Sequence, residues 1–199
     1  IAAKRLYFNG SAPVSVSGTS TTEVSTKVSG PFNNLGVPGA KSYHLVAAGY
    51  GNVAGVAGGL ANPYFARFST SATTTVLADA LAQSPTFFSL WIGGNDVLGY
   101  ATSGGVGVNQ TGNNNAATYA SNDITDPGVF AYVYNALITN LTANGAKGVV
   151  ANLPYVSTLP YFTTVPYNPL SVSVLGSGNT AVGQATISAL NTQLYGPLK

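Results

Sequence analysis

Two short turns in the sequence hold groups that could stabilise negative charge on an oxygen atom. Gly39, within a Pro-Gly-Ala turn, can present a backbone N–H that no side chain covers. Asn95, within the turn Gly93–Asp96, can present the N–H groups of its side-chain amide at close range. Two such donors aimed at one position have the composition of an oxyanion hole, the site that stabilises the tetrahedral intermediate of acyl transfer.

Asp96 and its neighbours also allow a simpler interpretation. The Asp96 side chain suits a cap on a helix that starts at Val97, or a loop fixed through backbone N–H groups, rather than proton transfer. Gly, Asn and Asp are common in turns for steric and hydrogen-bonding reasons, so the segment could form a turn and nothing more. From local chemistry alone, that interpretation is favoured.

The order and spacing of these residues resemble those of a known family. Gly93-Gly94-Asn95-Asp96, directly after an apolar run, resembles the third motif, Gly-x-Asn-Asp, of the SGNH (GDSL-type) hydrolases. The segment 33–40, NNLGVPGA, resembles the second motif, whose glycine donates a backbone N–H to the oxyanion hole; Gly39 matches it better than Gly36. Flanking segments such as AKSYHL, NPYFARF and VLGYATSGG are similar to those of secreted GDSL-like lipases/esterases of Bacteroidetes, and this similarity covers nearly the whole chain.

The resemblance implies carboxylic ester hydrolysis by a serine nucleophile in the full protein, with Gly39 and Asn95 as the catalytic oxyanion donors. Gly93 and Asp96 would support the turn that carries Asn95. The family's mechanism is metal-independent, so the resemblance implies no cofactor, and the implied partner is an ester or lipid substrate. The implied fold is a three-layer α/β SGNH-hydrolase-like fold with a parallel sheet, incomplete in this chain.

Two motifs of that family are missing from the sequence. No Gly-Asp/Asn-Ser-Leu tetrapeptide supplies the nucleophilic serine, and no Asp-x-x-His follows near the C-terminus, because His44 is the only histidine. Ser42, Ser89 and Ser103 offer hydroxyls, but no spacing marks one of them as a nucleophile. A serine is a weak nucleophile until an oriented imidazole takes its proton. We therefore expect the chain alone to be inactive, and His44 to be a structural imidazole packed under the oxyanion loop.

Three functional hypotheses remain open. In the first, the chain is an internal portion of a serine ester hydrolase, and the missing terminal segments are separate chains or were removed. In the second, a hydrolase-like core forms a noncatalytic extracellular structural or filament protein that self-assembles through exposed strand edges. In the third, the chain is a surface or carbohydrate-binding module, because one proline-rich stretch holds Tyr155, Tyr161, Phe162 and Tyr167.

Composition narrows these hypotheses. Charged residues are only 6% of the 199 residues and the seven bases are scattered, so the sequence has no basic stripe for nucleic acid. The lack of Cys and the single His exclude thiolate and His-rich metal sites, although calcium on loop carbonyls stays open. No apolar stretch reaches the roughly 18 residues that indicate a transmembrane helix. The Thr-, Asn- and Gly-rich chain begins at Ile1, which favours a processed or partial product, secreted or at the cell surface.

The elements that must position the two turns follow from hydrophobic periodicity. Apolar runs at 32–37, 86–92 and 147–153 predict strands of a parallel sheet, and ligands bind beyond the carboxyl ends of such strands. Helices are predicted at 73–82, from an Asp126 cap to Gly145, and at 179–194. A polar insertion at about 101–127 predicts a surface loop within a single, partial domain that covers 1–199. Loss of the strand with the first motif should leave apolar sheet surface uncovered.

Overall fold

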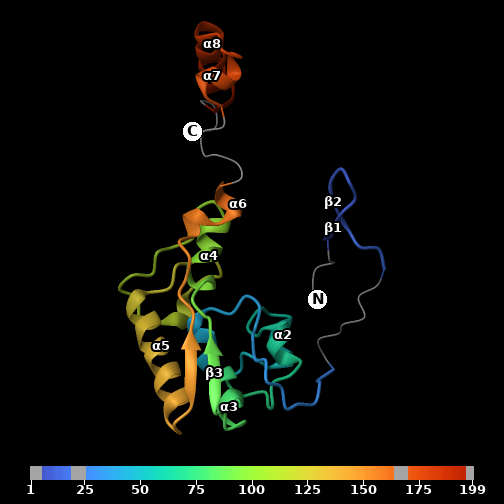
Figure 1. The fold of residues 1–199 in the computed structure, drawn as a ribbon, viewed down its shortest axis with the longest axis vertical. Coiled ribbons are helices and arrows are strands. Elements are labelled where there is room, and N and C mark those ends of the chain that lie inside the picture. The colour runs from blue at the N-terminus through green and yellow to red at the C-terminus, as the bar shows by residue number, and fades with distance from the viewer. Residues whose placement is uncertain (1–5, 19–25, 164–169, 196–199) are drawn as a thin grey trace. The chain divides into compact units, whose positions relative to one another are not determined.

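A computed structural model describes residues 6–18, 26–163 and 170–195 of the chain (Figure 1). Contacts between residues divide the chain into two compact units, Ile1–Leu153 and Pro154–Lys199. The first unit combines helices with a small parallel sheet, so the fold class is mixed α/β.

A parallel pair of strands lies at the centre of the first unit. β3 (Phe87–Leu90) pairs with β4 (Lys147–Val150), and Phe87 lies opposite Lys147. This pairing confirms the predicted strands at 86–92 and 147–153, although both strands are shorter than their apolar runs. Within the described residues each strand has a neighbour on one side only, so both outer edges of the pair are free.

The predicted strand at 32–37 is wrong. This segment is irregular, and the side-chain oxygen of Asn34 accepts a hydrogen bond from the Gly36 backbone N–H at 2.9 Å. An asparagine bonded to the backbone two residues on forms a local turn, which competes with strand pairing. Leu35 and Val37 still pack against the core, which explains why the apolar pattern resembled that of a strand.

α5 (Pro127–Thr142) is the longest helix of the described residues and follows the predicted signals. The Asp126 side chain caps the helix by accepting a hydrogen bond from the Val129 backbone N–H at 2.8 Å. The helix ends before Gly145, which has a φ of +81° that favours glycine. Its buried residues recur every four positions and so share one face: Val133, Leu137 and Leu141.

Two shorter helices precede and follow β3. α3 (Val76–Leu81) is capped by Thr75, whose hydroxyl accepts a hydrogen bond from the Ala78 backbone N–H. The predicted helix at 73–82 is therefore confirmed in its centre, but it starts later because its N-cap, Thr75, has an extended backbone with φ −109° and ψ 159°. α4 (Asn95–Thr102) begins inside the Gly-Gly-Asn-Asp turn.

The hydrophobic core lies where α5 packs against α3 and the 3-10 helix η1 (Ser42–Val46). Leu90 in β3 and Ile92 just after it also pack against this core. The buried members of the core cluster are Ala40, Leu45, Tyr50, Phe65, Val76, Val133 and Leu137.

Side chains alternate along a strand, so the other face of the parallel pair carries different residues. On that face Phe87 is 62% exposed, Val149 is 58% exposed, and Trp91, just beyond β3, is 73% exposed. Parallel sheets are normally covered by apolar contacts on both faces. The pair therefore has one face partly covered by the core, on which Val150 is still 50% exposed, and one apolar face open to solvent.

The polar insertion at about 101–127 is ordered by carboxylates rather than by apolar packing. The Asp123 carboxylate accepts hydrogen bonds from the Val108 and Ala120 backbone N–H groups and from the Gln110 side chain, at 2.6 to 2.8 Å. A short 3-10 helix, η2 (Ala116–Thr118), lies within the loop. The aspartates of the described residues are all buried: Asp79, Asp96, Asp123 and Asp126.

Short elements complete both units. The first unit also holds the antiparallel pair β1 (Leu6–Phe8) and β2 (Pro13–Ser15), followed by α1 (Val53–Val56) and α2 (Pro63–Ala66). The second unit holds η3 (Val156–Thr158), α6 (Pro160–Thr163), α7 (Val172–Leu175), α8 (Thr180–Leu190) and a π-helical turn, η4 (Asn191–Tyr195).

The second unit confirms the helix predicted at 179–194. The Asn179 side chain caps α8 by accepting from two backbone N–H groups. Of the aromatic residues considered for ligand binding, Tyr155 and Tyr161 are exposed, whereas Tyr167 lies outside the described residues. No helix in the described ranges has the length and apolar character needed to cross a membrane.

Candidate functional site

The two turns singled out in the sequence lie against each other in the first unit. The side-chain amide of Asn95 donates a hydrogen bond from Nδ2 to the backbone oxygen of Ala40 at 2.9 Å. Ala40 is buried and directly follows Gly39, so this bond holds the start of α4 beside the Pro-Gly-Ala turn. An asparagine amide has two N–H groups, and one of them remains for a further acceptor.

Gly39 is placed as a hydrogen-bond donor with open space beside it. Its φ of +78° lies in the left-handed region, which favours glycine, and no atom would come within 4 Å of an added Cβ. Gly39 is exposed to solvent. Its backbone N–H has no hydrogen-bond partner in the described part of the chain. The backbone N–H of Gly39 is therefore an accessible hydrogen-bond donor.

Asp96 fixes the second of the two turns from the inside. Its carboxylate accepts from the Ser42 backbone N–H at 2.9 Å and from the Ser42 hydroxyl at 2.7 Å, and both residues are buried. Two roles were predicted for Asp96, a helix cap and a contact that fixes the loop. The structure shows the second, because α4 already starts at Asn95 and the Asp96 carboxylate bonds to η1. A buried, charge-assisted pair of hydrogen bonds thus joins η1, which follows the Pro-Gly-Ala turn, to the Gly93–Asp96 turn.

Gly93 supports the turn because no larger residue fits. Its φ is +119°, and an added Cβ would lie 2.7 Å from Leu153 Cδ1 and 2.9 Å from Phe130 Cε2. Gly94 differs, since its φ is −55° and nothing lies within 4 Å of a Cβ there. The supporting role of the first glycine is therefore both conformational and steric.

The hydroxyls considered as nucleophiles are not paired with an imidazole. Ser42 is fully buried and donates to Asp96, and Ser103 donates to the Val106 backbone oxygen at 2.7 Å. Ser89 is exposed on the open face of β3. None of these three hydroxyls therefore forms part of a serine–histidine pair within the described residues.

His44 is a structural imidazole in this arrangement. Its Nδ1 accepts a hydrogen bond from the Lys41 backbone N–H at 3.0 Å, and its ring stacks on Tyr50 with centroids 4.3 Å apart. Burial, and secondarily the charge of Lys41, lowers the pKa of His44 to about 4. The ring is therefore neutral at pH 7 and helps to shape the segment that follows Gly39.

Lys41 is a site residue that sequence reasoning missed. Its side chain is 4% exposed, and Nζ donates to the Asp123 backbone oxygen at 2.7 Å, which ties the Pro-Gly-Ala turn to the polar insertion. Burial lowers the pKa of Lys41, against the opposing effect of the Asp96 and Asp123 charges. The sequence did hold one signal for this role: Lys41 directly follows the segment 33–40 in a chain with very few charged residues.

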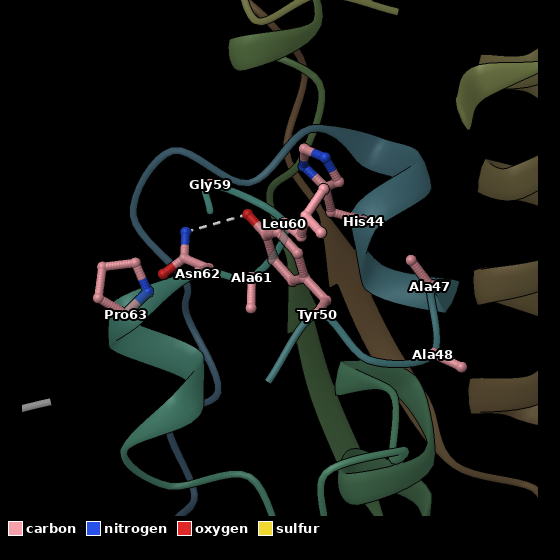
Figure 2. Close-up of a pocket in the computed structure, with 9 residues that line it drawn as sticks. All are labelled: His44, Ala47, Ala48, Tyr50, Gly59, Leu60, Ala61, Asn62 and Pro63. Atoms are coloured by element: carbon pink, nitrogen blue, oxygen red, sulfur yellow. Dashed lines mark hydrogen bonds between the residues drawn. The ribbon is translucent and has the colours of Figure 1, made fainter. Parts of the chain in front are cut away.

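A small hollow is lined in part by Asn62, whose side chain bonds to the backbone oxygen of Pro38, the residue before Gly39 (Figure 2). It has a volume of about 260 Å³. The residues that line it are His44, Ala47, Ala48, Tyr50, Gly59, Leu60, Ala61, Asn62 and Pro63. Groups of three or more His, Cys, Asp or Glu that could hold a metal ion do not occur among the described residues.

Comparisons of the chain with protein-family models, with curated proteins and with solved structures found no match. Function is accordingly inferred from the sequence motifs and from the contacts around Gly39, Asn95 and Asp96.

Proposed function

We propose that the chain forms the oxyanion-stabilising part of a serine carboxylic ester hydrolase of the SGNH (GDSL-type) family. The observation that carries this proposal is the hydrogen bond from Asn95 Nδ2 to the Ala40 backbone oxygen, which holds the Asn95 turn against the residue that follows Gly39. In the reaction, an ester carbonyl oxygen becomes negatively charged as the tetrahedral intermediate forms. Two preorganised donors stabilise that charge, and each is worth about 3 kcal/mol in comparable sites.

The nucleophile and its base would come from segments that carry the Gly-Asp/Asn-Ser-Leu and Asp-x-x-His motifs. This follows from the chemistry, because Ser42 is buried on Asp96 and His44 uses Nδ1 to accept from Lys41. We expect the 199-residue chain alone to be inactive towards esters.

The finer fold that we propose is a three-layer SGNH-like fold, of which this chain supplies part. The free edges of β3 and β4 support it, since a further parallel strand could pair at either edge. The open apolar face with Phe87 and Val149 supports it as well, because a parallel sheet is normally covered on both sides. Because the resembling lipases/esterases are secreted, we also propose that the protein is located outside the cell or at its surface.

The experiment that tests the proposal isolates the native protein with an antibody against residues 26–163. Its peptides are mapped, it is labelled with a fluorophosphonate, and hydrolysis of p-nitrophenyl acetate and butyrate is measured. We expect peptides with both missing motifs, on the same or an associated chain, and a label on the serine of the first. The recombinant 199-residue chain serves as the unlabelled, inactive control. A native protein with neither motif nor esterase activity would refute the proposal.

A second candidate function is a noncatalytic extracellular protein that self-assembles. The specific observation in its favour is the exposed apolar face with Phe87, Trp91 and Val149 beside free strand edges. Sedimentation velocity of the chain and of the variant Phe87→Lys tests it. Assembly predicts large species that the variant dissolves into monomers, whereas a monomeric parent chain would eliminate this candidate.

A further inference from the structure

Three of the nine residues that line the hollow beside the Pro-Gly-Ala turn are polar, and the others are apolar residues or glycine. The polar members are His44, Tyr50 and Asn62 (Figure 2). The Asn62 side-chain amide donates from Nδ2 to the Tyr50 hydroxyl oxygen at 3.0 Å and to the Pro38 backbone oxygen at 2.9 Å. These bonds connect Asn62 both to Tyr50 and to the residue that precedes Gly39.

Two hydrogen-bond donors remain among these polar residues. His44 accepts through Nδ1, so the single proton of its neutral ring is on Nε2. The Tyr50 hydroxyl oxygen accepts from Asn62, so its own proton is available to another acceptor. A ligand in the hollow is therefore recognised by an oxygen that accepts hydrogen bonds.

The remaining lining excludes charge and limits size. Ala47, Leu60, Ala61 and Pro63 provide apolar contacts, and none of the nine lining residues carries a charge at pH 7. A bound ion would lose its hydration without a partner of opposite charge, which is costly. A volume of about 260 Å³ is below the range of drug-sized ligand pockets, so the hollow suits a ligand of a few heavy atoms.

We propose that this hollow is a binding site for a small uncharged carbonyl group next to a methyl, such as an acetyl group in ester or amide linkage. The carbonyl oxygen accepts from the Tyr50 hydroxyl or from His44 Nε2–H, and the methyl contacts Ala47, Leu60 and Ala61. The site is distinct from the oxyanion donors, because it uses neither Gly39 nor Asn95. Its test accordingly needs no catalysis and can fail or succeed independently of ester hydrolysis.

The test titrates the full 199-residue chain at pH 7 with N-methylacetamide and follows the NMR signals of the His44 ring and the Ala47 and Ala61 methyl groups. We expect saturable shifts with a dissociation constant on the order of millimolar, as for a ligand of five heavy atoms. Acetate and tetramethylammonium are the charged probes of similar size. We expect each to bind about tenfold more weakly or not at all, because the lining offers no opposite charge.

Matched variants separate binding in the hollow from weak surface binding. Leu60 is 81% exposed, so Leu60→Trp should fold normally while its larger side chain fills the hollow and abolishes the shifts. Val106→Trp places the same side chain at a site that is 67% exposed and outside the hollow, and it should bind like the parent chain. Tyr50→Phe should weaken binding roughly fivefold by removing one donor.

Three results would each overturn the proposal. These are the absence of saturable shifts, unchanged binding in Leu60→Trp, and binding of acetate as tight as that of N-methylacetamide. Ester hydrolysis by the native protein would leave each of these results unaffected, so failure of the acetyl site and failure of the proposed function are distinguishable.

Discussion

The buried carboxylate of Asp96 holds both the backbone N–H and the hydroxyl of Ser42, at 2.9 and 2.7 Å. The two residues are 54 positions apart in the chain, and their contact joins η1 to the start of α4. Any displacement of either turn would therefore have to break hydrogen bonds to a buried charge.

The first prediction concerns the stability that this contact provides. Asp96→Asn removes the charge and replaces one acceptor oxygen with an NH₂ group, so the Ser42 hydroxyl must accept instead of donating and both charge-assisted hydrogen bonds become neutral ones. We expect the free energy of unfolding to fall by about 2 to 4 kcal/mol, measured by urea denaturation. Ser42→Ala removes only the hydroxyl bond and should cost about half as much. Equal stability of Asp96→Asn and the parent chain would show that the pair does not anchor the turns.

The second prediction concerns Asn95 in the intact, active enzyme that contains this chain. Asn95→Ala removes both amide N–H groups, so kcat should fall roughly 10²- to 10³-fold with less effect on KM. Asn140→Ala is the control, since Asn140 also bonds a backbone oxygen but lies exposed on α5. An unchanged kcat in Asn95→Ala would remove this residue from the oxyanion hole.

The third prediction compares two adjacent glycines. Gly93→Ala puts a Cβ within 3 Å of Leu153 and Phe130 and forces a strained φ, so it should destabilise the protein by more than about 2 kcal/mol. Gly94→Ala meets no atom and has a helical φ, so it should be neutral or stabilise by about 0.5 kcal/mol. Thermal unfolding of both variants checks the contrast. Equal melting temperatures would mean that the turn relaxes around the added methyl.

The fourth prediction is a pH dependence of stability due to His44. Its pKa is lowered from 6.5 to about 4 in the folded protein, mainly by burial, so the unfolded chain takes up the proton first as the pH falls. The contribution of His44 is complete above about pH 6.5 and is lost between about pH 6.5 and 4, by at most about 3 kcal/mol. Asp123 and Asp126 have lowered pKa values and remain ionised through most of this window.

Urea midpoints at pH 7, 6 and 5 measure this dependence. The variant His44→Gln lacks the titrating ring, so its stability should change little over the same range. A parent chain with the same flat profile as the variant would show that the histidine is accessible to water and to protons in the folded state.

The sequence predicted the elements whose signals are local. The N-terminus and the buried face of α5 follow from Asp126, Pro127 and the four-residue spacing of Val133 and Leu137, all within one segment. The two strands of the parallel pair follow from short apolar runs. The strand expected at 32–37 failed because a single side-chain bond, from Asn34 to the Gly36 N–H, decided the local conformation, and an apolar pattern does not reveal such a bond.

The oxyanion roles of Gly39 and Asn95 stay predictions, whereas the side chains that support their turns were not predicted. Gly39 and Asn95 were identified from their motifs, and their turns do lie together. The burial of Lys41 and its bond to the Asp123 backbone oxygen were not expected, because they depend on a contact 82 residues away. Long-range polar contacts of this kind leave no periodic signal in the sequence.

The burial of all four described aspartates has a consequence for how the molecule meets other surfaces. Each of these carboxylates accepts hydrogen bonds from within the protein, and each residue is at most 8% exposed: Asp79, Asp96, Asp123 and Asp126. Lys27 and Lys147, in contrast, are exposed to solvent. Cations at the surface therefore have no neighbouring carboxylate among the described residues to offset them at close range. The protein should be retained on a cation-exchange resin more strongly than its formal charge of +2 indicates.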